Sequence, residues 1–474
     1  MATGSAAQSS TRHSIVIIGA GFSGAATAIN LLRRHGDKSL HITLVNRHPD
    51  LGRGVAYGTH SPSHLLNVPA GRMSLFPDDE DDFLRYASQI DPKITGADFV
   101  PRSVYGHYLE TRLKEVSGVA QVARLKSLTA EVIDLQVTAD GRRAELELVD
   151  GSRIEADRAV LTTGNYLPAD PPVPDKAFFD SALYIRDPWA PGAYDSLRPQ
   201  QPVLLIGTGL TMIDVALELT HRDVAGPLFA LSRRGLLPQA HRHHTGIPPT
   251  PRVVRDRLLN GTANVRRYLQ VVRQCIADLP GTDWRDVVGA MRPITADLWR
   301  ALDMEERRRF LRHVQPYWDT HRHRMAPSTS RQLARLVEGH RLVTASGRLI
   351  RLESAGDTAL VTWRSRGSSA EAKLEVGAVI NCTGPQTRLS HISDRLVQSL
   401  LARGLMRPDV LGLGVETGSD DALIDKAGRC SPVLYYTGPL LRAHYWECTA
   451  VPELRLSAAR LADRLVDSLM KCAV

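Results

Sequence analysis

The sequence has few cysteines, and they stand far apart. The chain has 474 residues and 5 cysteines, which are Cys275, Cys382, Cys430, Cys448 and Cys472. No two of them form a CxxC pair or lie within a few residues of each other, so the pattern excludes a disulfide framework, a cysteine-based zinc site and a redox-active dithiol. Such a chain fits a reducing compartment.

Long apolar runs and blocks of like charge are also lacking. Residues 1–13 are small and polar, without the apolar segment of a signal peptide, and no run elsewhere is long enough to span a bilayer. We therefore expect a cytoplasmic protein with no membrane partner. The net charge is +8, but the arginines are dispersed, which disfavours nucleic-acid binding. A phosphate-bearing cofactor or an anionic substrate is a better use for this charge.

The sequence does contain an internal repeat of one structural unit. Residues 14–18 are a buried β-branched run ending at Gly19, a helix is expected from about Gly21 to Arg34, and residues 40–46 predict a second buried strand. Together these segments predict a βαβ unit. The same order returns with the strand Val203–Ile206, a "GTG" turn, a helix and the strand "PLFALSR".

Each unit continues into an antiparallel meander. Residues 128–160 alternate and carry the hairpin signals "ADGR" and "VDGS", and "HRLVTASGRLIRLES" and "TALVTWRSRG" follow the second unit. Residues 250–336 are rich in arginine, leucine and helix formers, and they predict an all-helical insertion. The C-terminal tail predicts a strand, a loop and an amphipathic helix that pack on the first unit.

The predicted fold class is therefore α/β, with two Rossmann-like dinucleotide-binding domains of the glutathione-reductase type, each with a meander. The predicted boundaries are 1–180 for the first part of one domain, 195–384 for the second domain with its insertion at 250–336, and 385–474 for the C-terminal part of the first domain.

The motif "GAGFSG" directly follows the first strand and has the GxGxxG spacing. Such glycines permit the tight turn, the approach of a pyrophosphate and close helix packing, and the helix N-terminus offers free amides to the anion. The candidate cofactor-binding residues here are Gly19, Gly21, Phe22, Ser23 and Gly24. At the end of the second strand, Asn46 and Arg47 stand where an acidic residue usually binds the ribose.

The second turn, "GTGLTMID", has Met212 at the third glycine position. Its candidate cofactor-binding residues are Gly207, Gly209, Leu210 and Thr211. The following strand ends in Ser232, Arg233 and Arg234, and a guanidinium there favours the 2′-phosphate of NADPH over NADH.

Three irregular segments supply further candidates. The stretch Arg53–Ser74 is a long loop of the kind that binds cofactors, and its candidates are Gly54, His64, Leu66, Asn67, Val68, Met73 and Ser74. Tyr317–Pro327 ends the insertion with His321, Arg322 and Arg324, a substrate-facing or anion-binding cluster, or equally a solvated helix end. These histidines, like His241–His244, lack the carboxylates or thiolates of a metal site, so no metal is expected. The segment 445–455 begins a helix with Pro452 and Glu453, so amides near Thr449, Ala450 and Val451 can face a negative atom, and Trp446 is a further cofactor-binding candidate.

In this order, the motifs resemble a known family. The motifs "GAGFSG", "GRGVAYGT", "HLLNVPAGRMS", "LTTGNYLP", "GTGLTMID", "LSRRGLLPQAH", "WDTHRHRMAP", "NCTGP" and "WECTAVPELR" resemble those of the FAD/NAD(P)-binding family of bacterial two-dinucleotide flavoproteins, distant relatives of flavin-dependent N-hydroxylating monooxygenases. The resemblance implies FAD in the first domain, NADPH in the second and the flavin between them. It adds the cofactor-binding candidates Thr163, Gly164, Gly384, Gly438 and Pro439. Disulfide-reductase relatives have an acidic residue in place of Pro439.

The resemblance implies an FAD-containing, NADPH-dependent oxidoreductase. The leading interpretation is a monooxygenase that acts through a flavin C4a-hydroperoxide on a small nucleophilic substrate of the amine type, with dioxygen as co-substrate. The alternatives are an NADPH-dependent flavin reductase or electron-transfer protein without oxygen insertion, and a non-catalytic flavin-bound redox sensor. Individual catalytic side chains stay unassigned, and the helical insertion is a candidate surface for homo-oligomers.

Overall fold

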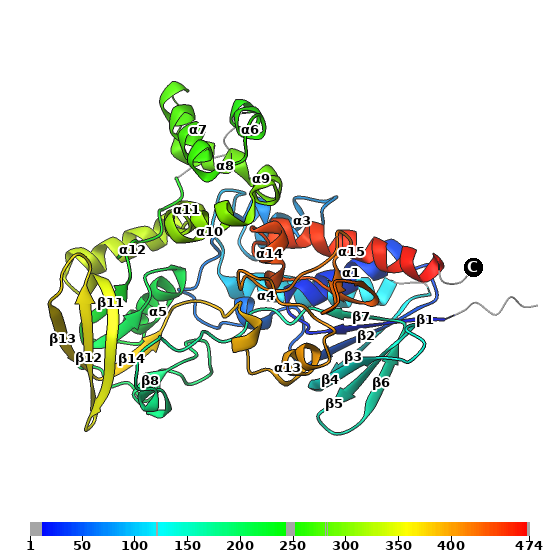
Figure 1. Ribbon diagram of the computed structural model, residues 1–474, viewed down its shortest axis with the longest axis horizontal. Coiled ribbons are helices and arrows are strands. Elements are labelled where there is room, and N and C mark those ends of the chain that lie inside the picture. Colours follow the sequence, from blue (N-terminus) through cyan, green and yellow to red (C-terminus); the bar gives the residue numbers. More distant parts are fainter. Residues whose placement is uncertain (1–11, 120–121, 243–251, 280, 282, 472–474) are drawn as a thin grey trace, which may run out of the picture.

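The N-terminal βαβ unit lies in the middle of a parallel sheet. The computed structural model describes residues 12–119, 122–242, 252–279, 281 and 283–471. One sheet has 6 strands in the order β15-β16-β7-β1-β2-β3 (Figure 1). Its strands are β1 (His13–Ile18), β2 (Leu40–Asn46), β3 (Arg124–Thr129), β7 (Arg158–Leu161), β15 (Ala422–Ile424) and β16 (Cys430–Tyr436). All its neighbouring pairs are parallel except β15 and β16.

Helices cover one face of this sheet. Helix α1 (Phe22–His35), which has alanine at three positions, is buried along most of its length and packs against α4 (Arg102–Val119) and the C-terminal helix α15 (Val451–Lys471). The other face carries the small sheet of β4 (Val132–Val137), β5 (Ala144–Leu148) and β6 (Arg153–Ala156), with α13 (Arg395–Ala402) on β4. The chain thus returns to its first sheet after residue 384, as the sequence predicts, because β16 pairs with β7. The boundaries 1–180, 195–384 and 385–474 stay predictions.

The second large sheet repeats the plan. It has 7 strands in the order β13-β12-β11-β10-β9-β14-β8. The strands are β8 (Tyr184–Ile185), β9 (Val203–Ile206), β10 (Leu228–Ser232), β11 (Leu342–Ala355), β12 (Thr358–Ser365), β13 (Glu371–Val376) and β14 (Ala378–Asn381). Strands β9, β10 and β14 pair in parallel, whereas β11, β12 and β13 form the predicted meander. The α/β fold class with two dinucleotide-binding units is confirmed.

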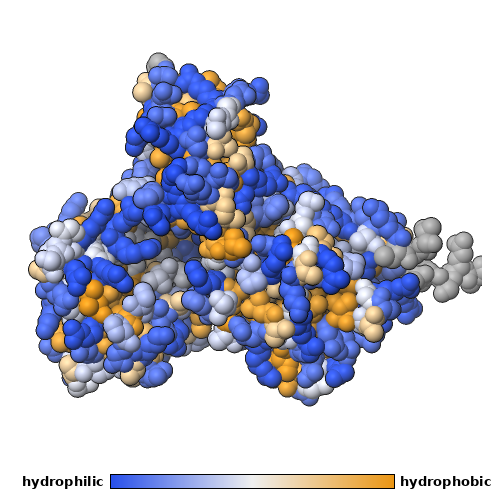
Figure 2. Space-filling model, viewed as in Figure 1, coloured by the Kyte–Doolittle hydropathy of each residue, from blue (hydrophilic) through white to orange (hydrophobic). Residues whose placement is uncertain are grey.

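The helical insertion stands above both sheets (Figures 1 and 2). It consists of α6 (Arg252–Leu259), α7 (Val265–Asp278), α8 (Trp284–Met291), η3 (Arg292–Ile294), α9 (Thr295–Ala301), α10 (Met304–His313) and α11 (Gln315–Arg322). The predicted end at residue 336 needs a correction. Helix α12 (Pro327–Glu338) packs on α5 (Leu210–His221) and β11, with Leu333 in the core of the second sheet, so it is the connecting helix of that sheet.

Short elements and loops fill the space between the layers. They include α2 (Gly54–Tyr57), η1 (Ala70–Arg72), α3 (Asp82–Ile90), η2 (Ala177–Asp180), η4 (Leu389–His391), η5 (Pro439–Leu441) and α14 (Arg442–Tyr445). An ion pair of 2.6 Å joins Arg102 of α4 to Asp214 of α5, and thus the two sheet units. In the described part of the chain, no helix combines the length and apolarity needed to cross a membrane.

Candidate functional site

The first glycine-rich turn is built by close contact between backbones. Gly19 has φ 103°, and a Cβ there would stand 2.5 Å from the Thr162 carbonyl oxygen. A Cβ on Gly24 would stand 1.9 Å from the Gly19 carbonyl oxygen. These two glycines therefore let β1, α1 and β7 meet, while the Thr162 hydroxyl donates to the Gly19 carbonyl at 2.6 Å.

The other glycines at this edge face open space, as a dinucleotide requires. A Cβ on Gly21 would meet only the Gly54 Cα, at 3.7 Å, within 4 Å. Gly164 has φ 72° and no heavy atom within 4 Å of an added Cβ among the residues described. With the N-terminus of α1 beside them, these residues fit the pyrophosphate of FAD. The Phe22 side chain packs in the core, so this residue can offer only its backbone amide.

Asn46 has a different role from the one predicted. Its Oδ1 accepts the Ala20 amide at 3.0 Å, and its Nδ2 donates to the carbonyls of His48 and Asp50 at 2.7 and 3.1 Å. The side chain therefore holds the glycine turn in place and does not reach out to a ribose. Arg47 pairs with Asp394 and, at 3.2 Å, with Glu131.

The second turn copies the first. Gly207 has φ 117°, and a Cβ there would stand 2.5 Å from the Cys382 carbonyl oxygen. Gly209 and Gly384 have no heavy atom within 4 Å of an added Cβ in the part of the chain described. Met212, which replaces the third glycine, is fully buried in the core of the second sheet. We call each open glycine turn a glycine cradle: Gly21 with Gly164 in the first unit, and Gly209 with Gly384 in the second. The second glycine cradle is thus open like the first.

The residues after β10 divide into a turn-forming serine and two arginines. The Ser232 hydroxyl contacts the Thr208 hydroxyl and accepts the Gly235 amide, both at 2.9 Å. Arg234 donates to the Arg312 carbonyl at 3.0 Å and lies over the Tyr317 ring. Arg233 is exposed and has no hydrogen bond or ion pair to any described residue. Of the residues predicted for the 2′-phosphate, Arg233 is the one left free.

The loop 53–74 approaches the second unit, but several of its candidate side chains point elsewhere. The side chains of Leu66, Val68 and Met73 belong to the first core, and the Ser74 hydroxyl is fully buried in its own turn. They can therefore meet a cofactor only through their backbone, because burial in the core removes their side chains from the loop surface.

Two other residues of this loop face the second unit. The Asn67 carbonyl accepts the His241 Nε2 at 3.1 Å. His64 packs on Trp189, and its buried Nε2 has no partner among the described residues. This loop therefore carries a polar atom suited to a ligand between the units.

The C-terminal motif anchors the insertion. Trp446 has φ 59°, a costly conformation for a bulky residue, and its ring lies 4.8 Å from those of Trp299 and Phe310. The Trp446 side chain is thus enclosed by α9 and α10, but its buried indole Nε1 has no partner among the described residues, so its contact with the cofactor stays a prediction. The amides of Thr449, Ala450 and Val451 have no acceptor within the described chain, so they keep their predicted role at the start of α15.

Gly438 and Pro439 lead into this motif. Gly438 has φ 142° and ψ −165°, a conformation open to glycine, and a Cβ there would stand 3.1 Å from the Tyr436 hydroxyl. The Pro439 carbonyl accepts the Cys448 thiol at 3.4 Å. Thr163 lies next to the open Gly164 at the other end of this edge.

A group of charged residues lies where the insertion meets the C-terminal motif. Glu447 is buried and accepts the Trp318 indole at 2.7 Å. Burial alone raises the pKa of Glu447, but the nearby Arg322 and His323 outweigh it and hold the pKa below its usual value. Glu453 forms a two-pronged ion pair with Arg292. Sequence reasoning missed Glu447 and Arg292 as site residues, because their partners lie far away along the chain.

The candidate substrate residues His321, Arg322 and Arg324 have different partners. Arg322 lies 3.4 Å from Glu447 and 3.6 Å from Glu453. The His321 Nδ1 lies 2.8 Å from the Tyr317 carbonyl oxygen, to which it can only donate, and its ring packs on Trp284, over which the Arg324 guanidinium also lies at 5.9 Å. The substrate-facing role of His321 stays a prediction, and Arg322 and Arg324 both keep buried polar atoms without partners in the described structure.

With this geometry in place, the comparisons with known proteins identify the fold. Residues 16–166 match the FAD-NAD(P)-binding family. The whole chain is similar to L-lysine 6-monooxygenase from Pseudomonas syringae, at 19% identity and TM-score 0.69, covering 96% of this chain and 99% of that one. Ornithine hydroxylase from Pseudomonas aeruginosa has 16% identity and TM-score 0.66, with 97% and 100% covered. No curated protein matches the sequence.

Thioredoxin reductases share this arrangement less closely. The enzyme from Lactococcus lactis has 11% identity and TM-score 0.51, covering 97% of this chain and 100% of that one. The described cysteines of the present chain are all unpaired, and Cys275, Cys382 and Cys448 are buried. In the described residues no group of His, Cys, Asp and Glu has the arrangement of a metal site.

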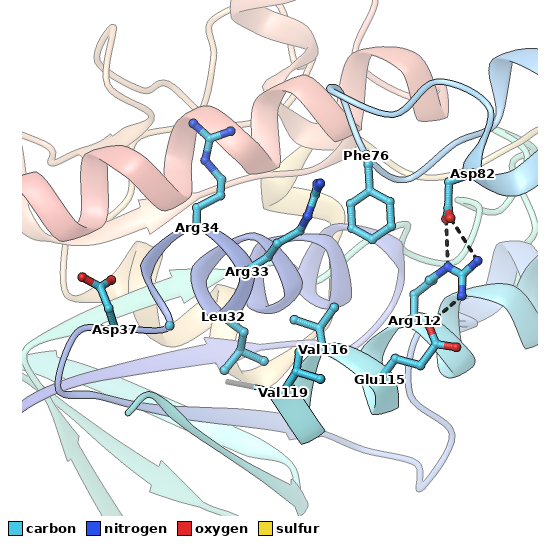
Figure 3. Close-up of a pocket in the computed structure, with 11 residues that line it drawn as sticks. Leu32, Arg33, Arg34, Asp37, Phe76, Asp82, Arg112, Glu115, Val116 and Val119 are labelled. Atoms are coloured by element: carbon cyan, nitrogen blue, oxygen red, sulfur yellow. Dashed lines mark hydrogen bonds and ion pairs between the residues drawn. The ribbon is translucent and has the colours of Figure 1, made fainter. Parts of the chain in front are cut away.

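Two cavities lie away from the charged group. One of about 570 Å³ lies between α1 and α4, where Arg112 pairs with Asp82 and Glu115 (Figure 3). The other, of about 1140 Å³, is lined by the proline-rich segment 167–174 together with Arg47 and Asp394. Arg112 in the first cavity and Arg47 in the second are paired with carboxylates. The second cavity is also lined by Lys176, Arg348 and Arg395, which are exposed to solvent and have no ion pair among the described residues.

Proposed function

We propose that this protein is an FAD-containing, NADPH-dependent monooxygenase that hydroxylates the nitrogen of a small amine. The observation that carries the proposal is the pair of open glycine cradles, Gly21 with Gly164 and Gly209 with Gly384, in a chain that follows N-hydroxylating monooxygenases over nearly its whole length. The match of residues 16–166 to an FAD-NAD(P)-binding family supports the same cofactors.

The chain's own residues would hold each cofactor in a distinct way. The amides at the start of α1 and the open backbone at Gly21 and Gly164 would receive the FAD pyrophosphate, and the free amides of Thr449 to Val451 would face the flavin edge that becomes negative on reduction. Gly209 would receive NADPH, with Arg233 available to its 2′-phosphate.

The bound flavin supplies the redox chemistry, in which R–NH2, O2, NADPH and H⁺ give R–NHOH, H2O and NADP⁺. The protein must position the amine and keep water away. The rings of Trp299, Phe310 and Trp446 close the junction between the insertion and the C-terminal motif. Glu447 fixes α11 there through the Trp318 indole, and no side chain needs to act as a nucleophile.

The purified holoenzyme tests this proposal. We expect NADPH to bleach the flavin absorbance without oxygen, and an amine to raise oxygen and NADPH consumption together with formation of a hydroxylated product. Hydrogen peroxide released without product must be measured and subtracted. Fast electron delivery to quinones or dyes without product would instead indicate a reductase, and an unbleached flavin would indicate a sensor.

Two further expectations belong to the proposal. The unpaired cysteines and the dependence on NADPH favour a cytoplasmic location. The insertion remains a candidate surface for self-association, which the mass of the protein in solution would test. The dithiol chemistry of thioredoxin reductases has no support in the sequence, because no two cysteines are close together.

A further inference from the structure

Three arginines converge between the loop 53–74 and the end of the insertion. We call Arg72, Arg322 and Arg324 the arginine cluster. Arg72 ends η1 within the loop, and the other two lie in or just after α11. The two segments are held together because His241, which donates to the Asn67 carbonyl, also donates its backbone amide to the Met325 carbonyl at 2.9 Å.

The guanidinium groups of this cluster are not satisfied by the protein. Arg322 Nε and Nη2 and Arg324 Nε are buried without a hydrogen-bond partner among the described residues. Arg322 is 11% exposed at its side chain, and its carboxylate neighbours stand at 3.4 and 3.6 Å without forming hydrogen bonds. Arg72 and Arg324 have no described carboxylate within the 4.0 Å of an ion pair.

The neighbouring carboxylates are already occupied. Glu453 accepts both prongs of Arg292, and Glu447 accepts the Trp318 indole. Burial, together with the positive charges of Arg322, Arg285 and Arg72, lowers the pKa of Arg324 to about 10. Burial and the charges of Arg292 and Arg322 also lower the pKa of Arg72. Arg72 and Arg324 thus have no described carboxylate at ion-pair distance, and Arg322 keeps unpartnered donors beside Glu447 and Glu453, which is costly unless an anion binds.

We propose that the arginine cluster binds the acidic group of the substrate, which is a small amine that carries one or more carboxylates and a net negative charge. This inference rests on the proposed monooxygenase function and names its substrate class. Guanidinium groups pair with carboxylates through charge-assisted hydrogen bonds, and the unpartnered Nε and Nη atoms are the donors for them. A diamine or a cationic amino acid would meet uncompensated like charge at the same place.

The cluster also lies where it can orient an amine. Arg72 comes from the loop predicted to run along the flavin, while Arg322 and Arg324 come from the insertion. A carboxylate held by both would tie the insertion to the loop. The insertion therefore contributes part of the substrate site, and the nitrogen that is oxidised projects from the acid end of the molecule.

Equilibrium binding to the FAD-loaded protein tests the inference. The probes are L-aspartate and L-glutamate as anionic amines, L-ornithine, L-lysine and cadaverine as cationic ones, and inorganic phosphate and NADP⁺ as alternative anions. The variants are Arg324→Met and Arg72→Met, with Arg324→Lys to retain the charge. Arg331→Met is the matched control, because Arg331 is an exposed residue of α12.

We expect an anionic amine to bind and each methionine variant to weaken this binding by about tenfold or more. Arg324→Lys should lose less, and Arg331→Met should bind as the wild type does. Without ligand, Arg324→Met should unfold at a temperature no lower than the wild type, because it removes an unpaired buried charge. This measurement distinguishes loss of a ligand contact from misfolding.

Tighter binding of ornithine, lysine or cadaverine, with NADPH-dependent hydroxylation of these amines, would overturn the inference and leave the monooxygenase proposal standing. Binding of phosphate or NADP⁺ that depends on Arg72 and Arg324 and excludes every amine would assign the cluster to a cofactor and also overturn the inference. Anionic amines that bind through the cluster but are not oxidised would support the acid site and contradict the monooxygenase proposal.

Discussion

At the scale of single residues, each glycine-rich turn contains two kinds of glycine. Gly19 and Gly207 have positive φ, and each would place a Cβ 2.5 Å from the carbonyl of a neighbouring strand's end. Gly21 and Gly209 begin the helices with φ −71° and −85°, which other residues can adopt. The first kind is required by the fold, and the second kind leaves room for a ligand.

This division predicts different effects for alanine substitutions at Gly207 and Gly209. Gly207→Ala should strongly destabilise the second unit, because its Cβ meets the Cys382 carbonyl and its φ is strained. Gly209→Ala should leave the thermal unfolding midpoint nearly unchanged and raise the KM for NADPH, since the added methyl fills the open cradle. Thermal unfolding and steady-state kinetics measure both effects. Equal unfolding midpoints for the two variants would contradict this assignment.

The two arginines after β10 should also differ. Arg233→Ala should lower the preference for NADPH over NADH by about tenfold, because Arg233 has no described protein partner and is free for the 2′-phosphate. Arg234→Ala should change it less, since its guanidinium is held by the Arg312 carbonyl and Tyr317. The ratio of kcat/KM for the two nucleotides is the measurement. An unchanged ratio in both variants would refute a phosphate site here.

At the scale of elements, patterns within one segment predicted the structure well. The run "LHITLVN" predicted a strand at residues 40–46, and the structure places β2 at Leu40–Asn46. Val203–Ile206 likewise became β9. Both are recognised because a strand buried in a parallel sheet is a short uninterrupted apolar run. The two meanders followed from alternation and turn residues in the same way.

The contacts that the sequence did not predict join segments that lie far apart in the chain. Asn46 looked like a ribose ligand until the structure showed its amide holding Ala20 and His48. Trp446 has Trp299 as its neighbour, which lies in the insertion. Arg72 was passed over because a single arginine in a loop has no spacing that marks it. No local sequence pattern predicts such pairings, so only the three-dimensional structure shows which residues meet at the junction.

The junction of the insertion with α15 predicts a coupled effect. Arg292→Gln and Glu453→Gln should each lower the thermal unfolding midpoint by a few degrees, because each leaves one half of a largely buried ion pair unsatisfied. The double variant should lose less than the sum of the two. Arg300→Gln is the control, since Arg300 is exposed and pairs only with Asp297 of its own helix among the described residues. Additive losses would show that the pair is not coupled.

At the scale of the whole molecule, the two sheet units and the insertion meet around a few buried polar contacts. Arg102 joins Asp214, and His241 joins Asn67, in each case linking one unit to the other. The arginine cluster lies beside the second contact, since Arg324 and Arg322 act on the charge of His241. The contact between the units, the proposed substrate site and the protonation of His241 are therefore linked in one place.

This linkage predicts how stability depends on pH. Burial and the charge of Arg324 lower the pKa of His241 from 6.5 to about 3 in the folded protein. Between these two pKa values the unfolded chain binds a proton at His241 and the folded chain does not. The contribution of His241 to the free energy of unfolding is therefore complete above about pH 6.5 and is lost progressively as the pH falls toward 3. The slope from one such group is about 1.4 kcal/mol per pH unit. His64 and His323 have lowered pKa values too, and they add to the same trend.

The thermal unfolding midpoint between about pH 5 and 7 isolates this effect, because most carboxylates stay ionised there. His241→Gln keeps an amide donor for the Asn67 carbonyl and cannot titrate, so its midpoint should fall less steeply with acid than that of the wild type. His41→Gln, at an exposed position of β2, should retain the wild-type slope. If the His241→Gln variant also retains the wild-type slope, His241 has the same pKa in the folded and unfolded chains. In that case the charges of Arg322 and Arg324 do not lower the pKa of His241 in the folded protein.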